Sequence, residues 1–170
     1  MTAIHVTLFL MIIIIWGVTG SGKTTISRAL GNSLRCPVFD ADNFHPEKNI
    51  QKMRAGMPLN DEDRYPWLQR LRVLVDSYTD EDVAVLACSA LKASYRKMLG
   101  FGQPHVRSFL LFGSDTLIAE RLARRDNHFM PSSLLPSQMQ LLELEHDGLT
   151  LNAERTPEQL VSQILRKLSI

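Results

Sequence analysis

The stretch MIIIIWGVTGSGKTT, residues 11–25, joins an aliphatic run to a loop that is rich in glycine. An uninterrupted run of this kind is typical of a strand that is buried on both faces of a parallel sheet. The segment from Gly17 to Thr24 fits the pattern G-x-x-x-x-G-K-[ST], which binds phosphate where it follows a strand and opens a helix. Because backbone N–H groups and a positive helix dipole meet at such a helix start, the segment predicts a site for a phosphate chain.

Two side chains of this loop indicate which phosphate compound binds. The Lys23 ammonium is predicted to bridge the β- and γ-phosphates, and the Thr24 hydroxyl is predicted to contact Mg²⁺. Together they predict a nucleoside triphosphate with magnesium, and ATP is the default. The nucleotide-binding residues predicted in the loop are Gly17, Val18, Thr19, Gly20, Ser21, Gly22, Lys23, Thr24 and Thr25.

Strand and helix patterns alternate along the chain, with short connections and no internal repeat. Strands are expected at 12–16, 36–42, 82–90, 106–112 and 149–152, and helices at 23–34, 45–56, 66–78, 92–99 and 156–168, with two more after Ser114 and Ser137. Repeated strand–helix units predict an α/β fold of three layers, a parallel sheet with helices on both faces. In such folds the site lies beyond the carboxyl ends of the strands.

The composition limits the classes of protein that fit. A chain of 170 residues with a net charge of +1 suits one ordinary domain and has no basic field for nucleic acid. The apolar run 6–16 is too short to span a membrane as a helix. Cys36 and Cys88 suit core thiols in a reducing compartment. We therefore expect a cytoplasmic protein with a single domain over 11–170, a dispensable extension at 1–10, and neither nucleic acid nor membrane as partner.

Two carboxylates, Asp40 and Asp42, end the second expected strand. Residues two apart on a strand share one face, so both side chains could enter the cleft. One carboxylate could serve the metal, and the other could accept a proton from an attacking hydroxyl. The residues alone leave open which carboxylate has which role.

Residues 44–68, FHPEKNIQKMRAGMPLNDEDRYPWL, carry an unusual cluster of charges. A solvated helix face explains the lysines of this segment, but it explains less well Arg54 beside a glycine turn or a charged loop at 61–64. A small polyhydroxylated acid needs an arginine fork for its carboxylate and short acceptors for its hydroxyls. These residues are therefore candidates for binding such a substrate.

Three arginines precede a proline-flanked segment, 126–136, that is expected to be a loop. Arg121, Arg124 and Arg125 have helical spacing and share one face. A mobile lid at about 125–137 could bring this face over the γ-phosphate, neutralise charge and exclude water. A solvated basic helix end is the alternative for Arg121 and Arg125.

Four blocks of the sequence resemble the gluconokinases, which are small P-loop kinases of sugar acids. The blocks are GVTGSGKTT, DADNFHPEKNIQKMRAGMPLNDEDRYPWL, ACSALKASYRKML and HFMPSSLLPSQ, and they occur in the family's order between Trp16 and about Glu143. The second and third blocks are far more specific than the phosphate loop. The resemblance implies a fold like that of shikimate and nucleoside monophosphate kinases, with five parallel strands in the order 2-3-1-4-5.

The resemblance also implies an activity, which is ATP-dependent phosphorylation of D-gluconate at its 6-hydroxyl in carbohydrate catabolism, and a homodimer. By similarity, Asp40 is the metal-side carboxylate or the base, Asp42 faces the substrate, and Arg124 is the lid arginine. Adenine contacts are expected around 152–156. The substrate-side residues that the resemblance implies are His45, Arg54, Asp63, Arg64, Ser89, Lys92, Arg96 and His128.

Other functions fit part of this pattern. A kinase of another small hydroxy acid or of a nucleotide would use the same phosphate loop, carboxylates and lid. A non-catalytic nucleotide-binding module is the alternative from another class. The sequence contains neither the N-K-x-D motif of a GTPase switch nor the L-S-G-G-Q signature of a transporter ATPase.

Overall fold

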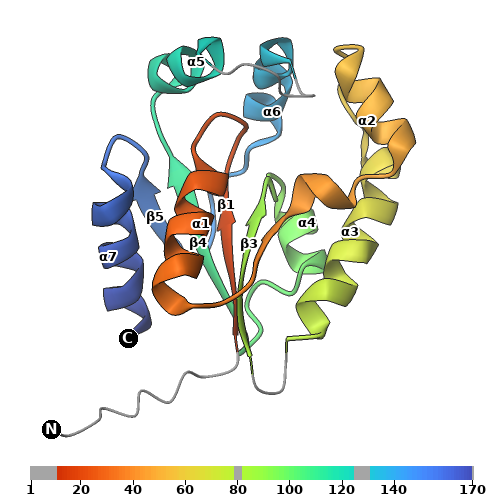
Figure 1. The fold of residues 1–170 in the computed structure, drawn as a ribbon. Coiled ribbons are helices and arrows are strands. Elements are labelled where there is room, and N and C mark those ends of the chain that lie inside the picture. Colours follow the sequence, from red (N-terminus) through yellow and green to blue (C-terminus); the bar gives the residue numbers. More distant parts are fainter. Residues whose placement is uncertain (1–10, 79–81, 125–130, 170) are drawn as a thin grey trace, which may run out of the picture.

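A computed structural model describes residues 11–78, 82–124 and 131–169, and its elements form three layers (Figure 1). Five parallel strands pair in the order β2-β3-β1-β4-β5, which confirms the order that the resemblance implied. The extension expected at 1–10 lies outside the described residues. The strands are β1 (Met11–Trp16), β2 (Val38–Asp40), β3 (Val83–Cys88), β4 (Val106–Phe112) and β5 (Leu149–Asn152).

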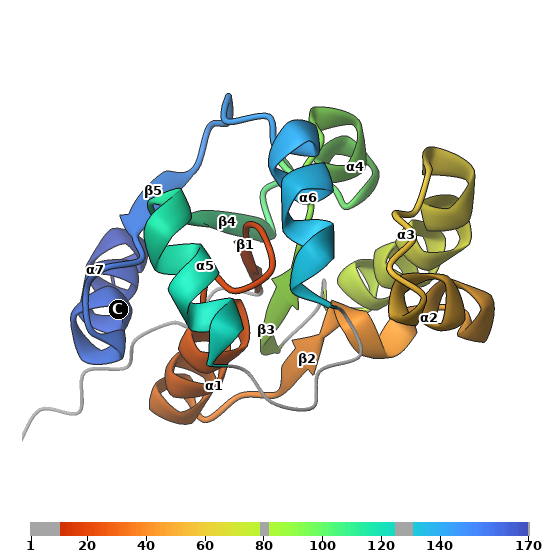
Figure 2. The same cartoon turned by 90° about the horizontal axis from the view of Figure 1, so that it is seen from above.

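Helices cover both faces of the sheet and also its carboxyl edge. One face carries α1 and α7, the other carries α3 and α4, and α2, α5 and α6 lie beyond the ends of the strands (Figures 1 and 2). The α-helices are α1 (Lys23–Leu34), α2 (Glu47–Arg54), α3 (Asp61–Asp76), α4 (Ala93–Met98), α5 (Asp115–Ala123), α6 (Leu135–Leu141) and α7 (Pro157–Leu168). Two short 3-10 helices, η1 (Ala41–Phe44) and η2 (Ser132–Leu134), follow β2 and precede α6.

Strand β1 lies at the centre of the sheet, between β3 and β4. All six of its residues are buried, as the aliphatic run predicted. Its even-numbered side chains join a core cluster with Trp67 and Leu71 of α3, and its odd-numbered side chains join a second cluster with Ile26 of α1 and Ile164 of α7. Because each large apolar side chain that is buried contributes about 1.5–3 kcal/mol, this strand anchors both faces.

Helix α3 begins at Asp61, and the expectation of a loop at 61–64 and a helix start at Pro66 is wrong. The Asn60 side chain accepts a hydrogen bond from the Asp63 N–H at 2.8 Å, and the Asp63 side chain accepts one from the Asn60 N–H at 2.9 Å. This reciprocal capping box starts the helix before the proline, which then lies inside it. The charged segment 61–64 is therefore a rigid first turn.

Helix α6 also begins earlier than expected. The helix expected after Ser137 begins at Leu135, and the Ser137 hydroxyl donates to the Leu134 carbonyl at 2.7 Å instead of capping the helix. Part of the expected loop 126–136 is consequently helical. Leu134 packs with Met53 and Leu59 in a small buried cluster, so η2 contacts the end of α2 and the segment before α3.

Within the described ranges, no helix is long and apolar enough to span a bilayer.

Candidate active site

The glycine loop connects β1 to α1 at the carboxyl edge of the sheet (Figure 2). Gly22 adopts a left-handed φ of 102° as the N-cap of α1, which a side chain would strain. A Cβ atom on Gly17 would lie 2.5 Å from the Leu111 carbonyl oxygen, so this glycine is required by close approach to β4. The protein's own backbone therefore constrains the loop that the sequence predicts to bind phosphate.

Two cations stabilise the loop. Lys23 Nζ donates to the Val18 carbonyl at 2.8 Å, which holds the ammonium over the loop. Arg121 of α5 donates to the carbonyls of Ser21 at 2.8 Å and of Ala153 at 2.7 Å. The sequence predicted that Arg121 contacts nucleotide; the structure shows that its guanidinium ties the loop to the segment between β5 and α7.

The Thr24 hydroxyl donates to Asp40 Oδ2 at 2.8 Å, so the start of α1 meets the end of β2. The other oxygen of Asp40 accepts the Asp42 N–H at 3.1 Å. Asp42 belongs to η1 and not to β2, so the expectation that both carboxylates share one face of the same strand is wrong. The Trp67 indole donates to the Ala41 carbonyl at 2.7 Å and thereby fixes η1 against α3.

Lys23, Thr24, Asp40 and Asp42 line a cavity of about 380 Å³, here called the first cavity. Burial raises the pKa of Cys88, which also lines it, to about 12, so the thiol stays protonated and inert. The lining comprises Thr19, Gly20, Ser21, Gly22, Lys23, Thr24, Thr25, Ile26, Asp40, Asp42, Ala87, Cys88, Ser89, Leu111, Arg121, Gln138, Ala153, Arg155, Pro157 and Leu160.

The oxygen donors of the first cavity fit magnesium. Thr24 and Asp40 present a hydroxyl and a carboxylate within hydrogen-bonding distance of each other. Mg²⁺ prefers such hard oxygen ligands and is usually held by one or two carboxylates together with phosphates and water. Among the described residues no group of three or more His, Cys, Asp and Glu could hold a metal ion by itself. This donor set therefore suits a metal that arrives with a nucleotide.

A second cavity, of about 470 Å³, lies between the start of α3, the β3–α4 connection and α6. The same two segments line both cavities: Ser89 and Gln138 face the first, whereas Lys92 and Leu141 face the second. The two cavities are therefore neighbours. The second cavity is lined by Leu59, Asn60, Asp61, Glu62, Arg64, Lys92 and Leu141.

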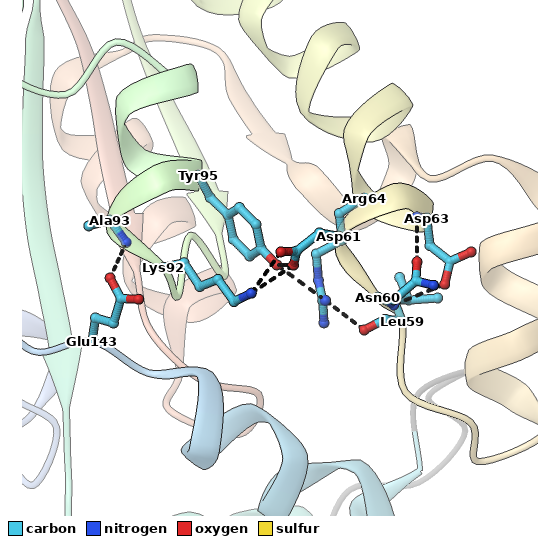
Figure 3. A network of polar contacts seen from close by, with 9 residues as sticks. All are labelled: Leu59, Asn60, Asp61, Asp63, Arg64, Lys92, Ala93, Tyr95 and Glu143. Atoms are coloured by element: carbon cyan, nitrogen blue, oxygen red, sulfur yellow. Dashed lines mark hydrogen bonds and ion pairs between the residues drawn. The ribbon is translucent and has the colours of Figure 1, made fainter.

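A network of polar contacts forms the wall of the second cavity (Figure 3). Lys92 Nζ contacts both carboxylate oxygens of Asp61, at 2.8 and 2.9 Å, and the Tyr95 hydroxyl donates to the same carboxylate. These bonds, that of Lys92 foremost, hold the pKa of Asp61 below its usual value. Arg64 Nη1 donates to the Leu59 carbonyl at 2.6 Å, while within the described ranges Nε and Nη2 have no hydrogen-bond partner.

Some predicted substrate residues lie outside this wall. Asp63 accepts from Lys52 Nζ at 2.6 Å and caps α3, so its carboxylate is engaged on the far side of the turn. Arg54 is exposed at the end of α2 and lines neither cavity. Arg124 is exposed at the end of α5. The predictions for Arg125 and His128 lie outside the described residues.

Arg96 is buried away from both cavities. Its guanidinium donates to the carbonyls of Ala90, Leu91 and Glu145 at 2.9–3.1 Å and lies 4.4 Å from the centre of the Trp16 ring. These contacts hold the β3–α4 connection against β1. Arg96 therefore binds backbone carbonyls and packs on Trp16, and it does not line the second cavity with Arg64 and Lys92.

The chain is similar in sequence to known kinases. The family model for shikimate kinase matches residues 19–169. A probable gluconokinase of Dictyostelium discoideum is 41% identical over 93% of this chain and 86% of its own length, and the thermosensitive gluconokinase of Escherichia coli is 46% identical over 76% and 70%. The chain belongs to the shikimate kinase family, and within it to the gluconokinases.

Solved structures agree with this assignment. A gluconokinase from Sinorhizobium meliloti is 36% identical, with a TM-score of 0.82 over 95% of this chain and 93% of its own. Shikimate kinase from Aquifex aeolicus, at 23% identity and a TM-score of 0.60 over 94% and 96%, shows the shared fold. The family relation confirms that this gluconokinase-family chain has a P-loop kinase fold.

Sequence reasoning missed Gln138 as a site residue of this family member. Its Oε1 accepts the Thr19 N–H at 2.8 Å, and the side chain is buried. The bond joins α6 to the phosphate loop across 119 positions of sequence. Its place in the fourth block of the resemblance was the one signal that could have identified it.

His45 follows η1 directly and is held neutral against α3. Its ring stacks on Trp67, with centroids 4.4 Å apart and planes 9° apart, and Nδ1 lies 3.4 Å from Asn49 Nδ2. Burial, followed by the charge of Arg64, lowers the pKa of His45 to about 4. The imidazole is therefore uncharged at neutral pH.

The first prediction concerns this histidine. Since the unfolded chain takes up a proton near pH 6.5 and the native imidazole does so near 4, stability is lost as the pH falls between these values. Urea unfolding at about pH 7.5 and pH 5 should show a loss in the wild type that exceeds that of His45→Phe by about 2 kcal/mol. Equal losses in both proteins would contradict the prediction.

The second prediction concerns Gln138. Gln138→Leu removes the acceptor of a buried N–H in the phosphate loop, so the KM for ATP should rise about five- to tenfold. Gln140→Leu, on an exposed position of the same helix, is the matched control and should leave this KM within about twofold. Steady-state kinetics at saturating acceptor measure both variants, and an unchanged KM in Gln138→Leu argues against the role of the bond.

Proposed function

We propose that this chain transfers the γ-phosphoryl group of ATP to the 6-hydroxyl of D-gluconate in the presence of Mg²⁺. The observation that carries the proposal is the pair of neighbouring cavities, one built on a phosphate loop and the other walled by Arg64 and Lys92. The curated relatives that bear the name gluconokinase support the choice of acceptor.

The first cavity is proposed to hold the nucleotide. Loop N–H groups and Lys23 would bind the β- and γ-phosphates at the positive end of α1. The cavity continues to Ala153, Arg155 and Leu160, and we infer that the adenosine moiety lies there. This agrees with the adenine contacts that the sequence analysis expected around residues 152–156.

Thr24 and Asp40 are proposed to hold the magnesium ion. Bound Mg²⁺ would neutralise charge on the β- and γ-phosphate oxygens. Asp40 is already engaged by the Thr24 hydroxyl and by the Asp42 N–H, which favours it as the metal-side carboxylate.

Asp42 is then the proposed general base. Its carboxylate would accept the proton of the 6-hydroxyl as the substrate oxygen attacks the γ-phosphorus. The new bond joins that oxygen to the γ-phosphorus, the bond from the γ-phosphorus to the β–γ bridging oxygen breaks, and ADP leaves. Arg124 stays the predicted lid cation for the charge that develops on the transferred group.

The second cavity is proposed to bind the acid end of the acceptor. Lys92 and Arg64 carry the two positive charges of the lining, and Asp61 and Glu62 carry two negative ones. Because Lys92 is paired with Asp61, Arg64 is the cation that is proposed to bind the acid. The Nε and Nη2 donors of Arg64 form the edge of a guanidinium, which matches a carboxylate in two parallel hydrogen bonds. A sugar acid can make this charge-assisted pair with its carboxylate, whereas a neutral sugar cannot. A cytoplasmic location and a homodimer stay predictions.

The test of this function is a comparison of acceptors. ATP, Mg²⁺ and the wild-type protein should convert gluconate to 6-phosphogluconate, as followed by a coupled dehydrogenase assay, and should turn over shikimate or AMP much more slowly. Lys23→Ala should lower the kcat about a hundredfold or more, because it removes the charge that follows the transferred phosphoryl group. Preference for shikimate or AMP would contradict the proposal, and near-normal turnover by Lys23→Ala would contradict its role.

A separate prediction distinguishes two arginines as the carboxylate contact. Arg64→Ala should raise the KM for gluconate about tenfold or more and leave the KM for ATP within about twofold, because a charged hydrogen bond to the acid is lost. Arg54→Ala, predicted from the sequence, should also act mainly on gluconate but less strongly, since Arg54 lines neither cavity. An equal rise in both KM values for Arg64→Ala would argue against the contact.

A further inference from the structure

We infer that Tyr95 is a positioning residue that presents Arg64 and Lys92 together to the acid end of the acceptor. The inference rests on the proposed function and deepens it, since it names the side chain that gives the second cavity its geometry. Tyr95 lies on α4, whereas Arg64 lies on α3, so the contact joins two helices through residues that are 31 positions apart in the sequence.

The Tyr95 hydroxyl contacts two charged side chains of the first turn of α3. The hydroxyl donates to Asp61 Oδ1 and accepts from Arg64 Nη1 at 3.4 Å (Figure 3). One phenol thus orders an anion and a cation that lie within the same turn of α3. Without it, Asp61 keeps Lys92 as a partner, whereas Arg64 keeps only the Leu59 carbonyl among the residues that the structure describes.

The aromatic ring of Tyr95 lies near both cations of the second cavity. The Arg64 guanidinium carbon lies 5.6 Å from the ring centre, and Lys92 Nζ lies 5.4 Å from it. Two like charges near one another repel, and the negative face of an aromatic ring is a favourable place for cations. The ring therefore lowers the free-energy cost of holding both cations at one wall.

The side chain of Tyr95 is held in place by the core. The side chain is 4% exposed and belongs to the core cluster that includes Trp67 and Leu71, so the ring is fixed from behind. Glu143 accepts the Ala93 N–H at 2.6 Å and holds the start of α4 (Figure 3). The hydroxyl consequently projects from a fixed frame toward side chains that border a cavity.

Burial, followed by the bond to Asp61, raises the pKa of Tyr95, so the hydroxyl stays protonated as a donor. The phenol is not placed to transfer a proton in the reaction, because its contacts are to Asp61 and Arg64 and it lines neither cavity. It acts on the acceptor through Arg64 and Lys92.

Tyr95→Phe tests this role, because it removes the hydroxyl and retains the ring. The Kd for gluconate, measured by calorimetry, should rise about five- to tenfold, with the KM for ATP within about twofold and the thermal midpoint within a few degrees. Tyr78→Phe is the matched control and should leave all three values unchanged, since within the described ranges the Tyr78 hydroxyl has no hydrogen bond. In an Arg64→Ala background, Tyr95→Phe should raise the Kd less than about twofold, because the two residues act together.

The outcomes separate the two proposals. A wild type that phosphorylates gluconate together with a Tyr95→Phe variant of unchanged Kd overturns the role of Tyr95 alone. Equal losses for gluconate and ATP also overturn it, since they indicate a general structural defect. A wild type that binds gluconate but never phosphorylates it overturns the proposed function while the comparison of Kd values still tests Tyr95. A wild type that does neither overturns both.

Discussion

The central strand β1 constrains the rest of this structure. It is hydrogen-bonded to a strand on each edge and covered by helices on each face, so its end cannot shift without disturbing both cores. The chain leaves this fixed point as a loop whose glycines contact β4 and open α1. A phosphate bound there meets backbone donors whose positions are set before the ligand arrives, and such preorganisation is what an electrostatic site needs.

The two cavities share their walls, and this follows from the topology. The β3–α4 connection and α6 each present one residue to the first cavity and another, three positions later, to the second. A nucleotide and an acceptor bound in these cavities would therefore both contact the same two segments. Arg96 stabilises the β3–α4 connection by binding the Ala90 and Leu91 carbonyls, and its bond to the Glu145 carbonyl joins this connection to the chain that follows α6.

The sequence predicted the sheet and the phosphate loop well because both depend on local patterns. The aliphatic run, the glycine spacing and the lysine are contiguous, and the strand order came from the resemblance. The start of α3 was missed because Asp63 completes a capping box for which glutamate or glutamine is the usual residue, and because Pro66 suggested a later start. The contacts of Tyr95 and Gln138 could not be predicted from local sequence patterns, since their partners lie 31 and 119 positions away. Arg96 matched a motif, but only its three-dimensional contacts show that its donors are occupied.

The small cluster of Met53, Leu59 and Leu134 has a mechanical consequence. It joins the end of α2 and the approach to α3 with η2, which leads directly into α6. Separating these three segments would expose three buried apolar side chains to water. A small displacement of one segment is therefore expected to move the other two. The side-chain amide of Gln138 on α6 in turn joins this group of elements to the backbone of the phosphate loop. A displacement at the second cavity, which Leu59 lines, would thus be transmitted to the phosphate loop, and any coupling between ligands bound in the two cavities would be equal in both directions.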